Sequence, residues 1–129
     1  MTPSNKQNLS QELEERLGKF GEQIIELAKK VPKNIVTIPI ISQFVRSGTS
    51  VGANYMEANG ASSKKDFKNK IYICKKEAKE TMHWLRMLAK SHEPSKEECR
   101  GLWQETKIYA KWFSSIIGGL NKKQKIQNE

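Results

Sequence analysis

Four polar residues in the middle of the chain have the types and the spacing of a chemical site. Arg46, Ser50, Asn54 and Glu57 follow one another at steps of four, four and three residues, which aligns them along one edge of a helix. Together they could bind a polar ligand, or they could satisfy one another and a neighbouring helix. Structural ion pairs often imitate functional sites. We therefore interpret the four residues as a structural polar seam in which Arg46 pairs with a carboxylate such as Glu57.

A second set of residues is basic and runs along a single helix face. At about 100° per residue, the cations between residues 64 and 90 fall within about a quarter-turn of one another. The acidic residues Asp66, Glu77 and Glu80 fall on the other side. At 1.5 Å per residue the basic stripe is about 40 Å long. It consists of Lys64, Lys68, Lys75, Lys79, Arg86 and Lys90.

A lysine stripe of this kind suits contact with a phosphate backbone, and the interleaved Tyr72 suits stacking on a base. The stripe has no base-reading pattern, so binding is expected to follow charge and shape. The alternative is that the stripe is a solvated helix face. The candidate nucleic-acid contacts are Lys64, Lys68, Tyr72, Lys75, Lys79 and Arg86, with Lys122, Lys123 and Lys125 as a loose second arm.

Motifs of catalysis are absent from the sequence. There is no Gly-rich phosphate loop, nucleophile elbow or metal pair, and no Cys/His cluster has zinc spacing. His83 and His92 are isolated. We therefore predict that the protein is not an enzyme, and we assign it no cofactor and no metal.

Composition points to an anionic partner and to the cytoplasm. The chain of 129 residues has a net charge of +9 and a pI near 9.6, which favours nucleic acid first and an acidic membrane surface second. The N-terminus lacks the apolar region of a signal peptide, and no apolar run is long enough to span a membrane. Cys74 and Cys99 fall on apolar helix faces and are interpreted as small core residues. A reducing cytoplasm is the simplest compartment.

Four helices are predicted to position these residues. Apolar residues recur at three- and four-residue steps within residues 9–31, 41–55, 67–89 and 99–120. Pro32 and the Asn59-Gly60 pair separate the first three segments, while Ser63 and Ser95 open capping boxes. Short connections imply antiparallel neighbours. We predict an all-α, antiparallel up-down-up-down four-helix bundle in a single domain of residues 1–129, frayed at residues 1–8 and 121–129.

The second helix is predicted to be central. From Pro39 to Met56 its only charge is Arg46, and its small residues include Gly48 and Gly52. Such a helix is usually buried on most of its circumference. We expect the other helices to pack around it.

Large apolar residues in surplus predict self-association. Ile73 and Trp84 lie off the core stripe of the third helix, and Ile108 and Trp112 lie off that of the fourth. Exposed aromatic residues usually mark an interface, so these four are the candidate oligomer interface. The alternative is that wide helix faces bury them within one subunit.

Several segments resemble the four-helix-bundle family of proteins encoded in intervening sequences of bacterial 23S rRNA genes. The resemblance extends over residues 15–120. It is carried by Arg46-Ser47, Ser50-Val51-Gly52-Ala53-Asn54, Glu57-Ala58-Asn59-Gly60, Ser63-Lys64-Lys65-Asp66-Phe67, Lys76-Glu77-Ala78-Lys79-Glu80-Thr81 and Trp84-Leu85. Tyr55-Met56 departs from the small or aliphatic residues that are common there.

The resemblance implies an up-down-up-down bundle that assembles as a ring, expected to be a homopentamer. It supplies no catalytic residues. It also implies an association with RNA, and proteins of similar fold serve as basic accessory factors of diversity-generating retroelements, where they partner a reverse transcriptase and nucleic acid. Our first hypothesis is therefore a non-enzymatic homo-oligomer that binds nucleic acid, RNA favoured. The alternative is a protein-interaction module, such as a retroelement accessory factor that partners a reverse transcriptase.

Overall fold

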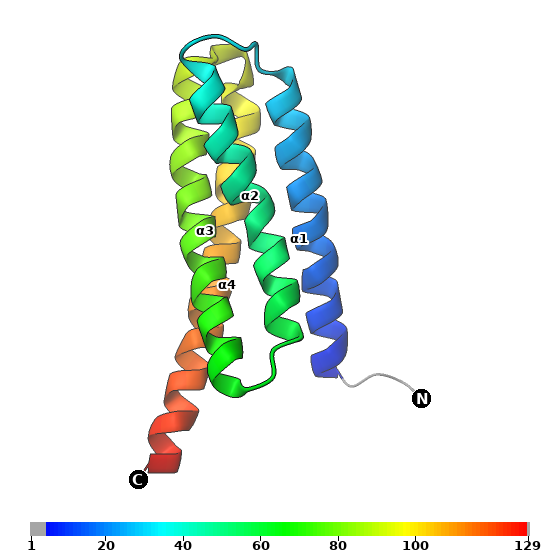
Figure 1. Cartoon of the computed structure of the whole chain (residues 1–129), viewed down its shortest axis with the longest axis vertical. Coiled ribbons are helices and arrows are strands. Elements are labelled where there is room, and N and C mark those ends of the chain that lie inside the picture. The colour runs from blue at the N-terminus through cyan, green and yellow to red at the C-terminus, as the bar shows by residue number, and fades with distance from the viewer. Residues whose placement is uncertain (1–4, 129) are drawn as a thin grey trace.

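The computed structural model describes the backbone of residues 5–128 and the side chains of residues 8–128, and it is built from α-helices joined by short connections (Figure 1). The helices are α1 (Asn5–Lys30), α2 (Thr37–Asn59), α3 (Lys64–Ser91) and α4 (Lys96–Asn128), with a short 3-10 helix, η1 (Glu93–Ser95), before α4. The all-α prediction is confirmed, and the described residues contain no strand.

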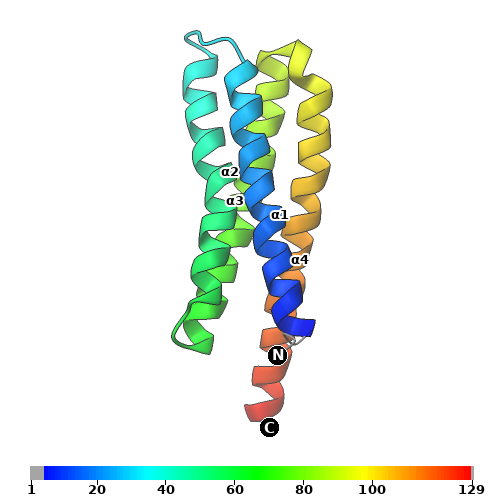
Figure 2. The ribbon, with the colours of Figure 1, turned by 90° about the vertical axis from the view of Figure 1, so that its right-hand side faces the viewer.

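Consecutive helices run antiparallel and close into a four-helix bundle, as predicted. Figure 2 shows α1 between α2 and α4, with α3 behind it. Ring contacts join α1 to α4, because the rings of Phe20 and Tyr109 meet edge to face with centroids 5.3 Å apart. The α1–α2 and α3–α4 connections lie at the same end of the bundle.

Local hydrogen bonds fix where the second and third helices begin. After Pro32, the side chain of Asn34 accepts hydrogen bonds from the backbone N–H groups of Val36 (2.9 Å) and Thr37 (3.0 Å), which turns the chain into α2. At the start of α3, the hydroxyl of Ser63 accepts a hydrogen bond of 3.1 Å from the backbone N–H of Asp66. The predicted N-cap at Ser63 is therefore confirmed.

The capping box predicted at Ser95 differs in the structure. Ser95 belongs to η1, and its hydroxyl lies 2.8 Å from Nδ1 of His92. Glu98, which should have closed the box, accepts a hydrogen bond of 3.2 Å from Lys30. The carboxylate is therefore used to join α1 to α4.

Both chain ends carry more helix than the sequence predicted. α1 begins at Asn5, and α4 runs to Asn128 in place of a frayed segment after residue 120; residues 1–4 and 129 lie outside the described part. Lys and Gln are good helix formers, which offsets the Gly118-Gly119 pair. Leu9, the first residue of the predicted apolar stripe, is 65% exposed and does not belong to the core.

The core is filled by the predicted apolar stripes. Phe20, Phe44 and Phe113 are fully buried, and so is Cys74, while Cys99 is nearly so. Desolvation raises the pKa of the Cys74 thiol to about 12 and that of Cys99 to about 11. Both cysteines are thus small core residues, as predicted, and not reactive thiolates.

The second helix packs closely on α1 but is not enclosed. A Cβ atom on Gly48 would lie 2.8 Å from side-chain atoms of Ile24, and one on Gly52 would lie 3.3 Å from the carbonyl oxygen of Leu17. Small residues are therefore needed on this side. The opposite face of α2 is open, with Ile38 55% and Met56 63% exposed. The expectation that α2 would be buried on most of its circumference is wrong, because the other helices cover only one side of it.

Candidate nucleic-acid interface

The predicted stripe on α3 faces solvent over its whole length. Lys64, Lys79, Arg86 and Lys90 are exposed, and Lys68 and Lys75 are half-buried along their stems. Tyr72 is 45% exposed between them. These contact candidates therefore share one accessible helix face.

A second row of cations lies on α4. Lys96, Arg100, Lys107 and Lys111 are all exposed and fall within about 60° of one another around the helix axis, and Lys122 continues the row. The α4 extension also carries Lys125 within this row, beyond the level of Lys64 on α3, whereas Lys123 falls on the opposite side of the helix. Lys107 lies over the ring of Trp103, with Nζ 5.4 Å from the ring centroid.

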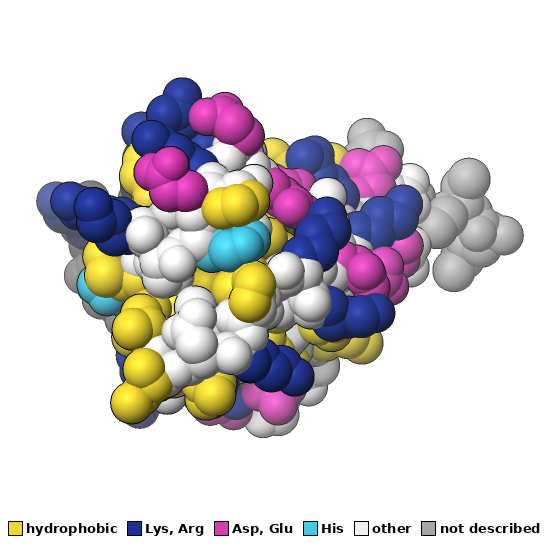
Figure 3. Space-filling view, turned by 90° about the horizontal axis from the view of Figure 1, so that it is seen from above, with side chains coloured by type: hydrophobic (Ala, Val, Ile, Leu, Met, Phe, Trp, Pro, Cys, Tyr) yellow, Lys and Arg dark blue, Asp and Glu magenta, His cyan; other side chains and the backbone are white. Residues whose placement is uncertain are grey.

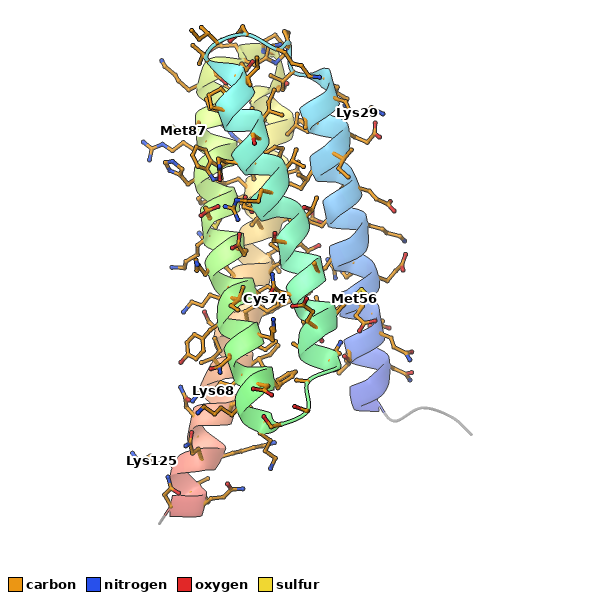
Figure 4. All side chains as sticks on the ribbon, viewed as in Figure 1. Lys29, Met56, Lys68, Cys74, Met87 and Lys125 are labelled. Carbon is orange, nitrogen blue, oxygen red and sulfur yellow. The ribbon has the colours of Figure 1, made fainter. Side chains whose placement is uncertain are left out.

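The two rows flank the same α3–α4 seam. On α3, the side chains that bond to α2 include Glu77, Glu80 and Thr81, and the cations of the row lie on the other side of the core stripe, which faces α4. On α4, the side chains that contact α1 include Glu98, Tyr109 and Trp112, and the cations again lie on the opposite side, which faces α3. Figure 4 shows Lys68 on the side of the bundle away from α1.

The cations are grouped in pairs that repeat every eleven residues. Each pair consists of positions i and i+4, and the same spacing occurs on both helices. We name three groups along the seam. The connection-proximal cluster is Arg86, Lys90, Lys96 and Arg100. The middle cluster is Lys75, Lys79, Lys107 and Lys111. The distal cluster is Lys64, Lys68 and Lys122.

Each cluster contains cations from both helices that lie at the same level along the bundle axis. The helices are antiparallel and rise equally per residue, so residues equally far from the α3–α4 connection lie level with each other. Counted from Ser91 back along α3 and from Lys96 forward along α4, partners such as Lys79 and Lys107 differ by one residue. Together the three clusters form what we call the basic face.

Among the described residues, the cations of the basic face form no ion pairs. In the described part of the chain, none of its cations has a carboxylate oxygen within 4.0 Å. The acids of α3 are engaged elsewhere. Asp66 accepts a hydrogen bond of 3.0 Å from the Ser62 hydroxyl, and Glu77 and Glu80 both pair with Arg46. The positive charge of the α3 row is therefore not neutralised by the acids of α3.

The polar seam joins α2 to α3, with different partners from those expected. Nη1 of Arg46 lies 3.1 Å from Glu77, and Nη2 pairs with Glu80. The predicted partner, Glu57, instead accepts from Lys70 at 2.7 Å. Arg46 and Glu57 are three helical turns apart on one helix, so the facing helix offers nearer partners. All three ion pairs, Arg46–Glu77, Arg46–Glu80 and Lys70–Glu57, are formed within one chain.

The remaining seam residues satisfy their own helix. The Ser50 hydroxyl donates to the carbonyl oxygen of Arg46, and the Asn54 amide donates to the carbonyl of Ser50 at 2.9 Å. Below them, the hydroxyls of Ser47 and Thr81 are fully buried and lie 2.9 Å apart. Within the part of the chain that the structure describes, no buried side-chain nitrogen or oxygen atom of the seam lacks a hydrogen-bond partner.

The predicted oligomer residues are only partly available. Ile108 is 45% exposed, but Ile73 is half-buried and Trp84 and Trp112 pack against the core. Trp112 also stacks under Arg16, whose guanidinium carbon is 5.0 Å from the ring centroid. The wide faces of α3 and α4 therefore use most of this apolar surface within one subunit.

An open groove of about 850 Å³ lies between α1 and α4, on the other side of α4 from the basic face. Its floor includes Leu102 and Ile108. Its rim is mainly acidic, with Glu22, Glu26, Glu98 and Glu105. This charge disfavours an anionic ligand.

The described residues contain neither a metal centre nor a membrane span. Between residues 5 and 128, no three His, Cys, Asp or Glu side chains come together as metal ligands. His83 is exposed, and His92 contacts Ser95. No helix in this range has the length and apolar character to cross a bilayer.

The sequence profile of a known family matches residues 11–115, which include the central part of every helix of the bundle. The chain belongs to the 23S rRNA-intervening sequence protein family. It is also similar to the crystal structure of a protein of unknown function from the S23 ribosomal protein family of Bacteroides thetaiotaomicron. That similarity has a TM-score of 0.72 and 32% sequence identity, and it covers 81% of this chain and 96% of the other. No curated protein matches the chain.

The part of the chain that the family profile matches contains most of the basic face. It includes the whole proximal and middle clusters, and of the distal cluster it omits only Lys122. Sequence reasoning found the α3 row but missed the α4 row. The signal was present, because Lys96, Arg100, Lys107 and Lys111 repeat the spacing of Lys64, Lys68, Lys75 and Lys79.

Proposed function

We propose that this protein is a non-enzymatic nucleic-acid-binding protein that contacts phosphate backbones through its basic face. The observation that carries the proposal is the grouping of unpaired cations on one side of the bundle. Cations of α3 and α4 lie there at the same levels along the bundle axis. Lys and Arg that neutralise phosphates release condensed counterions, which supplies affinity without reading bases. The absence of a base-reading pattern on the face is consistent with recognition by charge and shape.

RNA is the favoured nucleic acid in this proposal. The support is the description of the family, which names an intervening sequence of 23S rRNA. The cations themselves accept any phosphate backbone. RNA and DNA are therefore to be compared directly in every binding experiment.

Self-association is the second part of the proposal, and its support is the outer side of α2. Copies of a protein with net charge +9 repel one another, so they associate most readily through uncharged faces. Ile38, Ala53 and Met56 are exposed on α2, and the only charge between residues 39 and 56, Arg46, is neutralised by α3. We propose this surface as the contact with a second copy, in a ring of subunits. A monomer mass in light scattering at micromolar concentration would contradict it.

The alternative is a protein-interaction module, such as an accessory factor of a reverse transcriptase. It is supported by exposed apolar residues at the end of the bundle that carries the two connections (Figure 3), where Ile35 is 91% and Val36 57% exposed. Such residues suit a protein partner. A protein that binds no nucleic acid would favour this alternative.

Fluorescence anisotropy between about 50 and 200 mM salt tests the proposed function. A labelled RNA stem-loop and a matched duplex DNA are titrated with the protein. With six to ten phosphate contacts, affinity is expected to fall by about 10³ to 10⁵ over this range. Absence of binding at 50 mM salt would show that the basic face is solvated only, and the proposal would be wrong.

A further inference from the structure

The clusters of the basic face have a regular spacing along the bundle. Cations at one position of α3 recur eleven residues later, as in Lys64, Lys75 and Arg86, and those of α4 do the same, as in Lys96 and Lys107. At 1.5 Å per residue, eleven residues span about 16 Å. They also complete slightly more than three helical turns, so the cations drift by only about 20° per repeat and stay on one face.

Strands of a double helix cross one side of the duplex at a similar spacing. One turn of B-form DNA measures about 34–36 Å. Each of the two strands crosses a given side of the duplex once per turn. Successive phosphate backbones on that side are therefore half a turn, or about 17 Å, apart on average. The spacing of the clusters is therefore close to half a turn of a double helix. Flexible lysine stems can absorb the difference in pitch between DNA and RNA helices.

We propose that the basic face takes double-stranded nucleic acid, with α3 and α4 lying along the duplex axis so that each cluster meets one strand as it crosses. The inference rests on the proposed function and specifies its ligand as a duplex of at least one turn. From the middle of the proximal cluster to the middle of the distal cluster the face spans about 33 Å, since two repeats separate them. That length is close to one full turn.

The face is less suited to a single strand. Proteins that hold single strands combine a charged groove with aromatic platforms on which successive bases stack. Here Tyr72 is the one exposed aromatic residue within the rows, and the groove between α1 and α4 is rimmed by glutamates. The cations are mounted on two straight, rigid helices, so a rigid duplex loses little conformational freedom on binding. Each phosphate contact also releases more counterion from duplex DNA than from a single strand.

The experiment measures the salt dependence of binding to hairpin-capped duplexes of about 6, 12 and 24 base pairs and to a 12-nucleotide single strand, in both RNA and DNA. The slope of log K against log salt reports the number of phosphate contacts in one complex. It does not depend on how many overlapping binding sites a longer duplex offers. Between 6 and 12 base pairs the slope should steepen by about 2.7, because three distal cations come within reach at about 0.9 each. From 12 to 24 base pairs it should not change. At about 100 mM salt the single strand should bind at least tenfold more weakly than the 12-base-pair duplex.

Two variants with the same charge change complete the test. The variant Lys64→Gln, Lys68→Gln, Lys122→Gln should lose the steepening between 6 and 12 base pairs. The control Lys19→Gln, Lys29→Gln, Lys33→Gln should keep it. A slope that grows in proportion to duplex length, or equal affinity for the single strand, would overturn the duplex inference and leave nucleic-acid binding intact. Absence of binding to every probe would overturn the proposed function itself.

Discussion

Neutralising the middle cluster will weaken nucleic-acid binding by on the order of a hundredfold or more at about 100 mM salt. The variant carries Lys75→Gln, Lys79→Gln, Lys107→Gln and Lys111→Gln. Each lost phosphate contact removes about 0.9 from the slope of log K against log salt, so four contacts remove about 3.6. The effect should be the same for different sequences, because the cluster reads no bases. Anisotropy titrations at several salt concentrations measure both quantities.

A control variant with the same change of net charge distinguishes the effect of where the lysines lie from the effect of the protein's total charge. Lys19, Lys29, Lys30 and Lys33 lie on α1 and in the loop after it, away from the basic face. Their exposed ion pairs contribute little to stability, so changing all four to Gln should leave the protein folded. This variant should lose far less affinity than the middle-cluster variant. Equal losses would mean that binding depends on the overall charge and not on the proposed face.

The substitution Arg46→Ala will lower the free energy of unfolding by about 2 kcal/mol. It removes the partner of Glu77, whose side chain is only 10% exposed, and leaves that carboxylate unpaired at the α2–α3 contact. Removing one member of a buried pair costs about 3–5 kcal/mol. Arg46 is 44% exposed, and solvent screening reduces this figure. Urea denaturation followed by circular dichroism measures the change.

Two further variants test the reason for this loss. In the Arg46→Ala background, Glu77→Gln should recover part of the stability, because a neutral amide costs less to bury than an unpaired carboxylate. Lys29→Ala removes an exposed pair with Glu26 and should change stability by less than about 0.5 kcal/mol. If Arg46→Ala were as mild as Lys29→Ala, the seam would not be structural.

The helices were predictable because their signals are local. The apolar stripes that include Phe20, Phe44 and Phe113 follow the period of an α-helix, and the Ser63 cap follows from its spacing to Asp66. The Ser95 box was not predictable, since Lys30 from a helix distant in sequence engages Glu98. The same limit applies to Arg46, because its partners are selected by the packing of α2 on α3.

The candidate site was predictable in part. A helical wheel showed that the cations of α3 share a face. It could not show that the cations of α4 face the same seam, since that depends on how the two helices are rotated against each other. The equal heights of Lys79 and Lys107 require the antiparallel pairing as well. The exposure of one side of α2 was not predicted, for a related reason. The low charge of a helix indicates that its surface is covered, but it does not say whether the same chain or another molecule covers it.

Lysine acetylation with and without a bound duplex, read by mass spectrometry, tests the central claim most directly. The account predicts that nucleic acid will protect Lys75, Lys79, Lys107 and Lys111, and will leave Lys19, Lys29 and Lys33 as reactive as in the free protein. Protection of the α1 lysines, or equal protection of both sets, would contradict the assignment of the α3–α4 basic face as the surface that binds nucleic acid.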